Sequence, residues 1–338
     1  MIACPLKGGV WRVLQPEILC DRLYARLANR ATVFPGGWGC EDTLERAGTY
    51  FARASSIDIR WQSPRPVPGG ELRSGTFFSP YAEHGLPAES HLAHVEWLLP
   101  EGWSHSTPVA IHFASTGDVG FVRRRKAAAL PLLRHGIGSV ILENPFYGPR
   151  RPDGQVGATL RSVSDLWCMG MALWEEGRAL LDWLTREGFD RLGVCGVSLG
   201  GQIASQVASL WPGPLAMATL VAPHNANVVY VDGILRPYLN RAQLSGHARC
   251  AEAGSPEAAL GRVLDPTDIR RFPIPERPDA CIRIGALFDA YVPPASVSIT
   301  HEIWPGSELR WIPTCHVRAV AYGGGQLVGP LREAFSRL

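Results

Sequence analysis

The stretch RLGVCGVSLGGQIASQVASLW, residues 191–211, constrains the fold of this chain more than any other. Residues 192–197 are a short continuous apolar run, which is typical of a buried strand. The glycine-rich sequence GVSLG closes this run, and Ile203, Val207 and Leu210 then recur at helical spacing. We therefore expect a buried strand that turns sharply into a helix.

The residue at the centre of this turn is Ser198, flanked by Gly196 and Gly200. A side chain at either glycine would collide with the neighbouring strand or helix, and the tight turn holds the serine hydroxyl above the sheet. The following helix directs its positive N-terminus at the same point. This pattern is typical of the nucleophile elbow of α/β-hydrolases. A serine that only caps the helix is the alternative, so the partners of a catalytic serine must also be found.

Length and composition fit one large α/β domain with an insertion, because the chain has 338 residues, 46% of them hydrophobic and 19% charged. The net charge of +2 does not favour nucleic acid as a partner, and no apolar run is long enough for an integral membrane contact. The first 13 residues lack the pattern of a secretory signal, and the eight cysteines form no C-x-x-C pair. We therefore expect a cytoplasmic protein with reduced cysteines, no metal and no cofactor. The oligomeric state is not predicted.

From residue 108 onward, buried strands alternate with helices, which is the pattern of a mostly parallel central sheet flanked by helices. Strands are expected at residues 71–79, 91–99, 109–113, 139–143, 192–197, 215–221, 281–288 and 309–314. Helices are expected at residues 14–30, 41–54, 165–187 and 327–338, together with the helix that follows Ser198.

These patterns predict an α/β-hydrolase core made of residues 71–224 and 281–338. Residues 1–70 are expected to form a helical and extended segment that packs on this core. Residues 225–280 lack a clear alternation of strands and helices and contain six prolines, which interrupt any long helix. We expect this segment to be a helical cap insertion that lies over Ser198 and contributes apolar walls to a pocket.

The acid and base that would activate the serine are expected after it in the chain, in the order acid and then histidine. The predicted strand 281–288 runs directly into Asp289, and the next predicted strand leads to His316. The carboxyl ends of parallel strands lie on the face where ligands bind. Ser198, Asp289 and His316 are therefore the predicted triad, in which His316 accepts the hydroxyl proton and Asp289 orients the imidazole.

An oxyanion hole would use the backbone N–H of Leu199 and a second N–H from Ala114 or Ser115, which follow the strand 109–113. Alternatives for the acid and the base fit the chain order or the strand ends less well; they are Asp232, Glu143, His224 and His112. Asp289 and His316 could each also have only a structural role, in a turn and in the core.

Two arginines follow the rigid turn Tyr147-Gly148-Pro149. Arg150 and Arg151 could form ion pairs with a nearby aspartate, such as Asp118, Asp153 or Asp165. They could instead hold an anionic group of the substrate through a forked hydrogen bond. In this second interpretation, the substrate is a small acyl compound that carries an anionic group. The candidate substrate-binding residues are then Tyr147, Arg150 and Arg151.

Several motifs together resemble one branch of the α/β-hydrolases. They are FPGGWG at 34–39, STGD at 115–118, ENPFYGPRRP at 143–152, SDL at 164–166 and GVSLGG at 196–201. The branch is the α/β-hydrolase domain-containing protein eighteen-like family, formerly a domain of unknown function. The resemblance extends from about Leu23 to the last helix, and it implies an α/β-hydrolase fold with Ser198, Asp289 and His316 as catalytic residues. It departs at residues 314–315, which are Thr-Cys where glycines are expected.

These observations predict a serine hydrolase that cleaves a carboxylic ester or thioester through an acyl-enzyme intermediate. An acyltransferase that uses the same triad is one alternative, since an alcohol or amine can replace water in the second step. A ligand-binding protein that keeps the fold but lacks turnover is the other. Neither the acyl length nor the alcohol, thiol or amine partner can be predicted from the residues.

Overall fold

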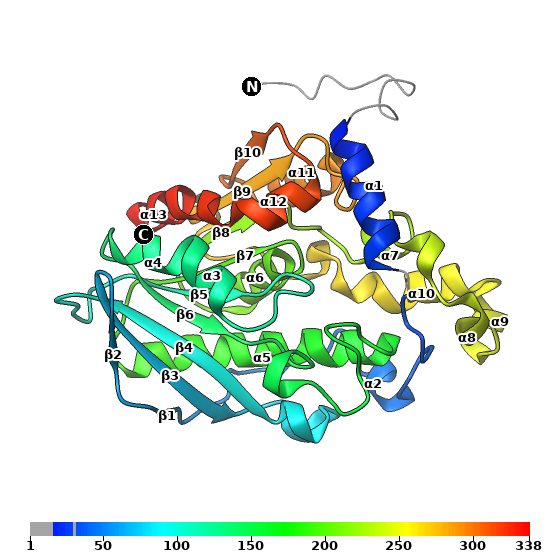
Figure 1. Ribbon diagram of the computed structural model, residues 1–338, viewed down its shortest axis with the longest axis horizontal. Coiled ribbons are helices and arrows are strands. Elements are labelled where there is room, and N and C mark those ends of the chain that lie inside the picture. The colour runs from blue at the N-terminus through cyan, green and yellow to red at the C-terminus, as the bar shows by residue number, and fades with distance from the viewer. Residues whose placement is uncertain (1–15, 30–31) are drawn as a thin grey trace.

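The computed structural model describes residues 16–29 and 32–338 of the chain. These residues form a central sheet with helices packed on both faces (Figure 1). The strands are β1 (Arg60–Trp61), β2 (Arg65–Val67), β3 (Gly70–Phe78), β4 (Leu92–Pro100), β5 (Val109–Phe113), β6 (Gly138–Leu142), β7 (Leu192–Val197), β8 (Ala216–Leu220), β9 (Cys281–Ala286) and β10 (Glu308–Ile312).

The order of strands across the sheet is β1-β3-β4-β6-β5-β7-β8-β9-β10, with β2 paired to β3. All neighbouring pairs from β6 to β10 are parallel. The pairs on the β1 side of β6 are antiparallel. The parallel part carries the predicted site, because parallel strands end at the same edge of the sheet and bring their following loops together.

The helices are α1 (Pro16–Ala28), α2 (Glu41–Glu45), α3 (Val122–Arg124), α4 (Leu130–Leu133), α5 (Val163–Arg186), α6 (Leu199–Leu210), α7 (Asn227–Tyr230), α8 (Arg241–Ser245), α9 (Ala248–Ala253), α10 (Pro256–Leu264), α11 (Pro294–Ile303), α12 (His316–Tyr322) and α13 (Val328–Ser336). A π-helical turn joins α3 to α4. None of the helices among the described residues is both long enough and apolar enough to span a bilayer.

The core has one layer on each face of the sheet. Because successive side chains of a strand point to opposite faces, Val194 of β7 packs with α5 and α6 while Cys195 packs with α4, α12 and α13. The longest helix, α5, is buried over most of its length, and a capping box of Ser162 and Asp165 fixes its first turn.

One predicted helix is wrong over most of its length. The segment 41–54 is helical only at Glu41–Glu45, because Arg46 closes the helix and Gly48 adopts a left-handed conformation with φ of 83°. The helices α11 and α12 were not expected from the sequence. Helix α11 lies between the parallel strands β9 and β10 and completes their crossover, whereas α12 follows β10, the last strand of the sheet.

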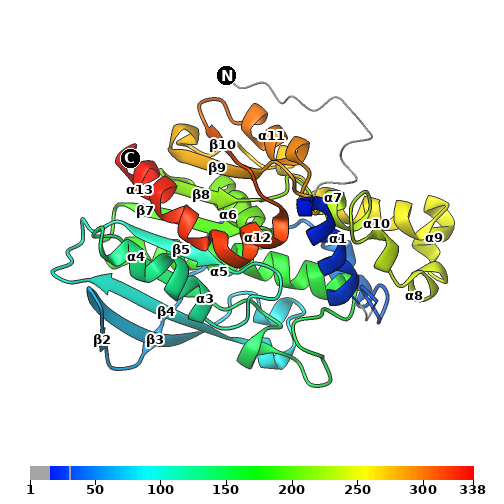
Figure 2. The same ribbon diagram turned by 45° about the horizontal axis from the view of Figure 1, so that its top comes forward.

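Residues 225–280 hold the short helices α7, α8, α9 and α10, which extend to one side of the sheet in both views (Figures 1 and 2). The N-terminal segment is tied to them, since the Val33 N–H donates to the Tyr238 carbonyl and the Asn240 N–H to the Val33 carbonyl. Helix α1 lies beside α12 and near α7 in both views. Residues distant in sequence therefore meet above the carboxyl ends of β7, β8 and β9. The division of the chain into a core and a cap stays a prediction.

Candidate active site

The turn between β7 and α6 has the geometry of a nucleophile elbow. Ser198 lies at φ 54° and ψ −119°, a conformation that is costly for a residue with a side chain. A Cβ atom added at Gly196 would overlap the backbone of Gly200, and one added at Gly200 would overlap the Phe113 carbonyl. The Ser198 N–H donates to the Leu220 carbonyl of β8 at 2.8 Å, which holds the turn against the sheet. The predicted sharp turn is confirmed.

The structure brings the three predicted triad residues together in one hydrogen-bonded chain. Ser198 Oγ lies 2.9 Å from His316 Nε2, and His316 Nδ1 lies 2.7 Å from Asp289 Oδ2. The other carboxylate oxygen of Asp289 accepts the N–H groups of Tyr291 and Val292 at 2.9 and 2.7 Å. Because these contacts orient the carboxylate and the ring, the imidazole is held with one nitrogen facing the serine and the other facing the acid.

The electrostatics of the site favour a histidine that binds a proton readily. Burial lowers the pKa of His316, but the charge and hydrogen bond of Asp289 and the charge of Asp21 outweigh it and raise the pKa above its usual value. Burial raises the pKa of Asp289, against the opposing effect of His316. The Tyr291 ring stacks on the imidazole at a centroid distance of 4.9 Å. These surroundings stabilise the imidazolium that forms when a serine proton is accepted.

Asp21 of α1 is a site residue that the sequence did not indicate. Its side chain is fully buried. Oδ2 accepts the N–H groups of Ala290 and His316 at 2.9 and 3.1 Å, and Oδ1 accepts the N–H of Val317 at 2.9 Å. One carboxylate therefore joins the loop after Asp289 to the loop that carries the histidine. The only available signal was an aspartate within a predicted helix.

Asp21 also replaces the missing cap of α12. Cys315, the residue before α12, makes no capping hydrogen bond with its side chain, while Asp21 neutralises the first N–H groups of that helix. Cys315 has φ −97° and ψ 171°, an extended conformation that any residue adopts. Glycine is therefore not required before His316, which explains why the chain can depart from the family pattern there.

The oxyanion hole can be placed only in part. Leu199 begins α6, so its N–H has no acceptor within the helix. Ser115 lines the cavity beside Ser198, whereas Ala114 is not among the residues that line it. The geometry therefore favours Ser115 over Ala114 as the second donor, and the assignment of both donors stays a prediction.

In the part of the chain that the structure describes, two cavities have Ser198 in their walls. The larger has a volume of about 440 Å³ and has His316 in its wall. The smaller has a volume of about 70 Å³ and does not have His316 in its wall. Val229 and Tyr230 of α7 line both cavities, so residues 225–280 contribute walls above the serine, as expected.

Comparisons with known proteins agree with this geometry. The family model described as alpha/beta hydrolase domain containing 18 matches residues 32–249 and 241–335. The chain belongs to this family. The match includes the elbow and the segments that carry Asp289 and His316, so the resemblance found in the sequence motifs is confirmed.

Among solved structures, the chain is similar to acetyl xylan esterase 1 from a Thermoanaerobacterium species. The TM-score is 0.58 at 15% identity, over 91% of this chain and 98% of that one. For an acetyl xylan esterase from Paenibacillus, the TM-score is 0.55 at 15% identity, over 89% and 90% of the two chains. At such identities the likeness shows the fold, which is that of the α/β-hydrolases.

A curated relative is an uncharacterized protein of Mycobacterium tuberculosis, 29% identical over 185 residues. The match covers 54% of this chain and 42% of that protein, so the chain spans about two fifths of the length of the curated relatives it matches.

Of the three candidate substrate-binding residues, only Tyr147 reaches a cavity. It lines the larger cavity, and its hydroxyl accepts the Gly117 N–H at 3.2 Å. Arg151 is exposed, and neither Arg150 nor Arg151 lines either cavity next to Ser198. Among the residues that the structure describes, the half-exposed Arg123 is the arginine that lines the larger cavity.

The prediction that Arg150 binds substrate is wrong, because Arg150 is fully buried in an ion pair with Glu176. Its two terminal nitrogens donate to the Glu176 carboxylate at 2.5 and 2.8 Å and to the carbonyls of Ser90 and Glu143. The alternative prediction, an ion pair between Arg150 and a nearby aspartate, is also wrong, because the partner is Glu176 of α5. The arginine therefore braces the loop after β6 against α5.

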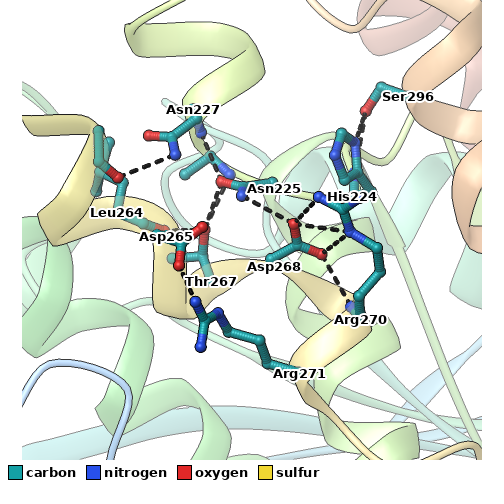
Figure 3. A network of polar contacts seen from close by, with 12 residues as sticks. His224, Asn225, Asn227, Leu264, Asp265, Thr267, Asp268, Arg270, Arg271 and Ser296 are labelled. Carbon is teal, nitrogen blue, oxygen red and sulfur yellow. Dashed lines mark hydrogen bonds and ion pairs between the residues drawn. The ribbon is translucent and has the colours of Figure 1, made fainter. Parts of the chain in front are cut away.

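The alternative acids and bases lie elsewhere, since none of them lines either cavity at Ser198. The His112 side chain contacts Ser139 at 3.0 Å, and burial lowers its pKa to about 3. His224 Nδ1 lies 2.7 Å from Ser296 Oγ, in the network of Figure 3. Glu143 accepts the N–H of Gly120.

The network in Figure 3 joins the start of the segment 225–280 to residues 267–268. The side-chain amide of Asn225 donates to Asp268, and the Thr267 hydroxyl lies 3.1 Å from the side-chain oxygen Oδ1 of Asn225. The first residue of the segment is thus bonded to the residues that follow α10. Within residues 16–29 and 32–338, no cluster of three or more His, Cys, Asp or Glu side chains could hold a metal ion.

Arg150→Ala is expected to lower the free energy of unfolding by about 3–5 kcal/mol, because it leaves the buried Glu176 charge unpaired. Arg151→Ala is the matched control and should change stability by less than about 0.5 kcal/mol. Urea denaturation of both variants measures the difference. Equal and small effects would contradict the bracing role.

Asp21→Asn is expected to lower the pKa of His316, because it removes a negative charge that raises this pKa. It should also cost about 1–3 kcal/mol of stability, since an amide accepts these N–H groups less well than a carboxylate. NMR titration of the His316 imidazole checks the shift. Glu17→Gln on the same helix is the control, and an equal shift in both variants would contradict a specific role of Asp21.

Proposed function

We propose that this protein is a serine hydrolase that cleaves a carboxylic ester or thioester through an acyl-enzyme intermediate. The observation that carries the proposal is the hydrogen-bonded chain from Ser198 through His316 to Asp289, whose serine and histidine line a cavity. The strained elbow supports it, since such strain persists where the surroundings enforce it and clusters at active sites. Membership of an α/β-hydrolase family is consistent with it.

The first half-reaction forms a bond between Ser198 Oγ and the substrate carbonyl carbon. His316 Nε2 accepts the serine proton as this bond forms, and Asp289 stabilises the resulting imidazolium. The carbonyl oxygen becomes an oxyanion, which the Leu199 N–H and the Ser115 N–H would stabilise. The tetrahedral intermediate collapses when the bond to the leaving oxygen or sulfur breaks, and His316 then gives its proton to that atom.

The second half-reaction repeats these steps with water. His316 accepts a proton from water as its oxygen attacks the acyl carbon, and the proton returns to Ser198 Oγ when the acyl–serine bond breaks. The products are a carboxylic acid and a regenerated serine.

Ser198→Ala should abolish hydrolysis of p-nitrophenyl esters and labelling by a fluorophosphonate, because the nucleophile is lost. Ser209→Ala is the matched control, since it removes a buried hydroxyl of α6 that has no hydrogen-bond partner among the described residues. Labelling of Ser198→Ala at the wild-type rate would contradict the assignment. Binding of an ester without a burst of product would instead indicate a protein that only binds.

Asp289→Asn should lower kcat for the same esters by about 10³–10⁴, because an amide in place of the carboxylate favours the wrong tautomer of the catalytic histidine. Asp232→Asn is the control, since Asp232 lines neither cavity at Ser198. Steady-state kinetics of both variants measure the loss. A mild effect at Asp289 with a large one at Asp232 would show that the acid is assigned wrongly.

The acid limb of the pH profile of kcat/KM should lie above the ordinary histidine pKa of about 6.5, since the pKa of His316 is raised. Activity is lost as the pH falls through this value, because a protonated His316 cannot accept the serine proton. A profile measured from about pH 5 to 9 checks the position of the limb. A midpoint at or below about 6 would contradict a His316 base in these surroundings.

A further inference from the structure

Two cavities of different size meet at Ser198, and their positions indicate which part of a substrate each one could bind. The cavities share Ser198 and Leu199, so a carbonyl bound at the serine and the predicted oxyanion donor adjoins both. The larger cavity, about 440 Å³, continues past His316, and the smaller, about 70 Å³, runs between α5, α6 and α7.

The chemistry of acyl transfer assigns a different part of the substrate to each cavity. His316 must give its proton to the leaving oxygen or sulfur, so this atom has to lie within hydrogen-bond distance of Nε2. The leaving group therefore extends into the space that adjoins His316. The acyl chain points in a different direction from the same tetrahedral carbon, and the cavity that lacks His316 lies beside it.

We propose that the smaller cavity binds the acyl group and the larger cavity binds the leaving group. The substrate class is then an ester or thioester that joins a short apolar acyl chain to a bulky alcohol or thiol. This inference rests on the proposed function of Ser198.

The walls of the smaller cavity, here named the acyl site, suit a short apolar chain. Side chains of α5, α6, α7 and α10 supply much of them, among them Leu166, Trp167, Ile203, Val229 and Leu264. A water-sized group needs about 10–15 Å³ of such a cavity, so the acyl site of about 70 Å³ holds about five to seven such groups. At about one such group for each carbon, this size corresponds to an acyl chain of about five to seven carbons.

The far end of the acyl site is closed by polar groups that bond to each other. The Gln206 amide donates to the Thr267 carbonyl at 2.9 Å, and its oxygen accepts the Trp174 indole N–H at 2.9 Å. Since both ends of this amide have partners, opening the site to admit a longer chain would break hydrogen bonds between buried groups.

The larger cavity suits a bulky leaving group. Aromatic and aliphatic side chains supply much of its wall, among them Tyr24, Phe34, Tyr147, Leu160 and Leu235. Its volume is about six times that of the acyl site. Size alone therefore distinguishes an ester from its isomer in which the two chains are exchanged.

The isomeric esters decyl butyrate and butyl decanoate test this assignment, because they have the same composition and differ only in which chain is the acyl chain. We expect kcat/KM to be at least about tenfold higher for decyl butyrate, since a pocket discriminates by about tenfold or more for each methylene that does not fit. Equal values, or a preference for butyl decanoate, would overturn the assignment.

Gly170 of α5 offers a variant that would narrow the acyl site. It lines this site, and a Cβ atom added to it meets no heavy atom within 4 Å. Gly170→Met should lower the ratio of kcat/KM for p-nitrophenyl hexanoate to kcat/KM for p-nitrophenyl acetate by about tenfold or more. Gly329→Met on α13 is the matched control, because it also places the side chain in open space on a helix, away from both cavities.

Fluorophosphonate labelling of the same variants separates this inference from the proposed function. If Ser198 is labelled but Gly170→Met and Gly329→Met have the same acyl-length profile, the assignment of the acyl site is wrong and the hydrolase proposal stands. If wild-type Ser198 is not labelled, the proposed function itself is wrong. Melting temperatures of both variants that match the wild type exclude a loss of fold as the cause.

Discussion

The structure depends on the close approach of two backbones at the elbow. The glycine at position 200 lies against the carbonyl of Phe113 at the end of β5, where no side chain would fit. This approach brings the loop after β5, which carries Ser115, alongside the first turn of α6. The serine, the start of a helix and the predicted oxyanion donors therefore share one small region. The strain at Ser198 is maintained because the parallel strands β5, β7 and β8 hold the turn from both sides.

Buried charges then fix the loops around this region. Asp21 bonds the backbone beside Asp289 to the backbone at His316, and Arg150 bonds the loop after β6 to Glu176. A buried charge is costly unless it is paired and hydrogen-bonded, so each of these groups tolerates only one arrangement of its partners. Such contacts favour one loop geometry strongly over others, which matters at a site where a proton moves between atoms 2.9 Å apart.

The helices α7 to α10 connect this geometry to substrate choice. Residues of α7 line both cavities, and the hydrogen bonds of Asn225 to Asp268 and Thr267 close the base of the segment. The histidine lies on one side of the serine only. Because the base lies on one side, the proposed reaction assigns the leaving group to the larger cavity and the acyl group to the smaller one.

The sequence by itself determined the strand–turn–helix around Ser198, the parallel sheet and the positions of Asp289 and His316 after two of its strands. These features follow from periodicity, glycine placement and chain order, which are local or ordered along the chain. It also predicted the family from short motifs. Only the tertiary structure decided that Glu176 pairs with Arg150, that Asp21 joins the two catalytic loops and that two cavities meet at the serine. These depend on which side chains meet across α1, α5 and α7 after packing, and distances between residues far apart in the chain leave no periodic signal in the sequence.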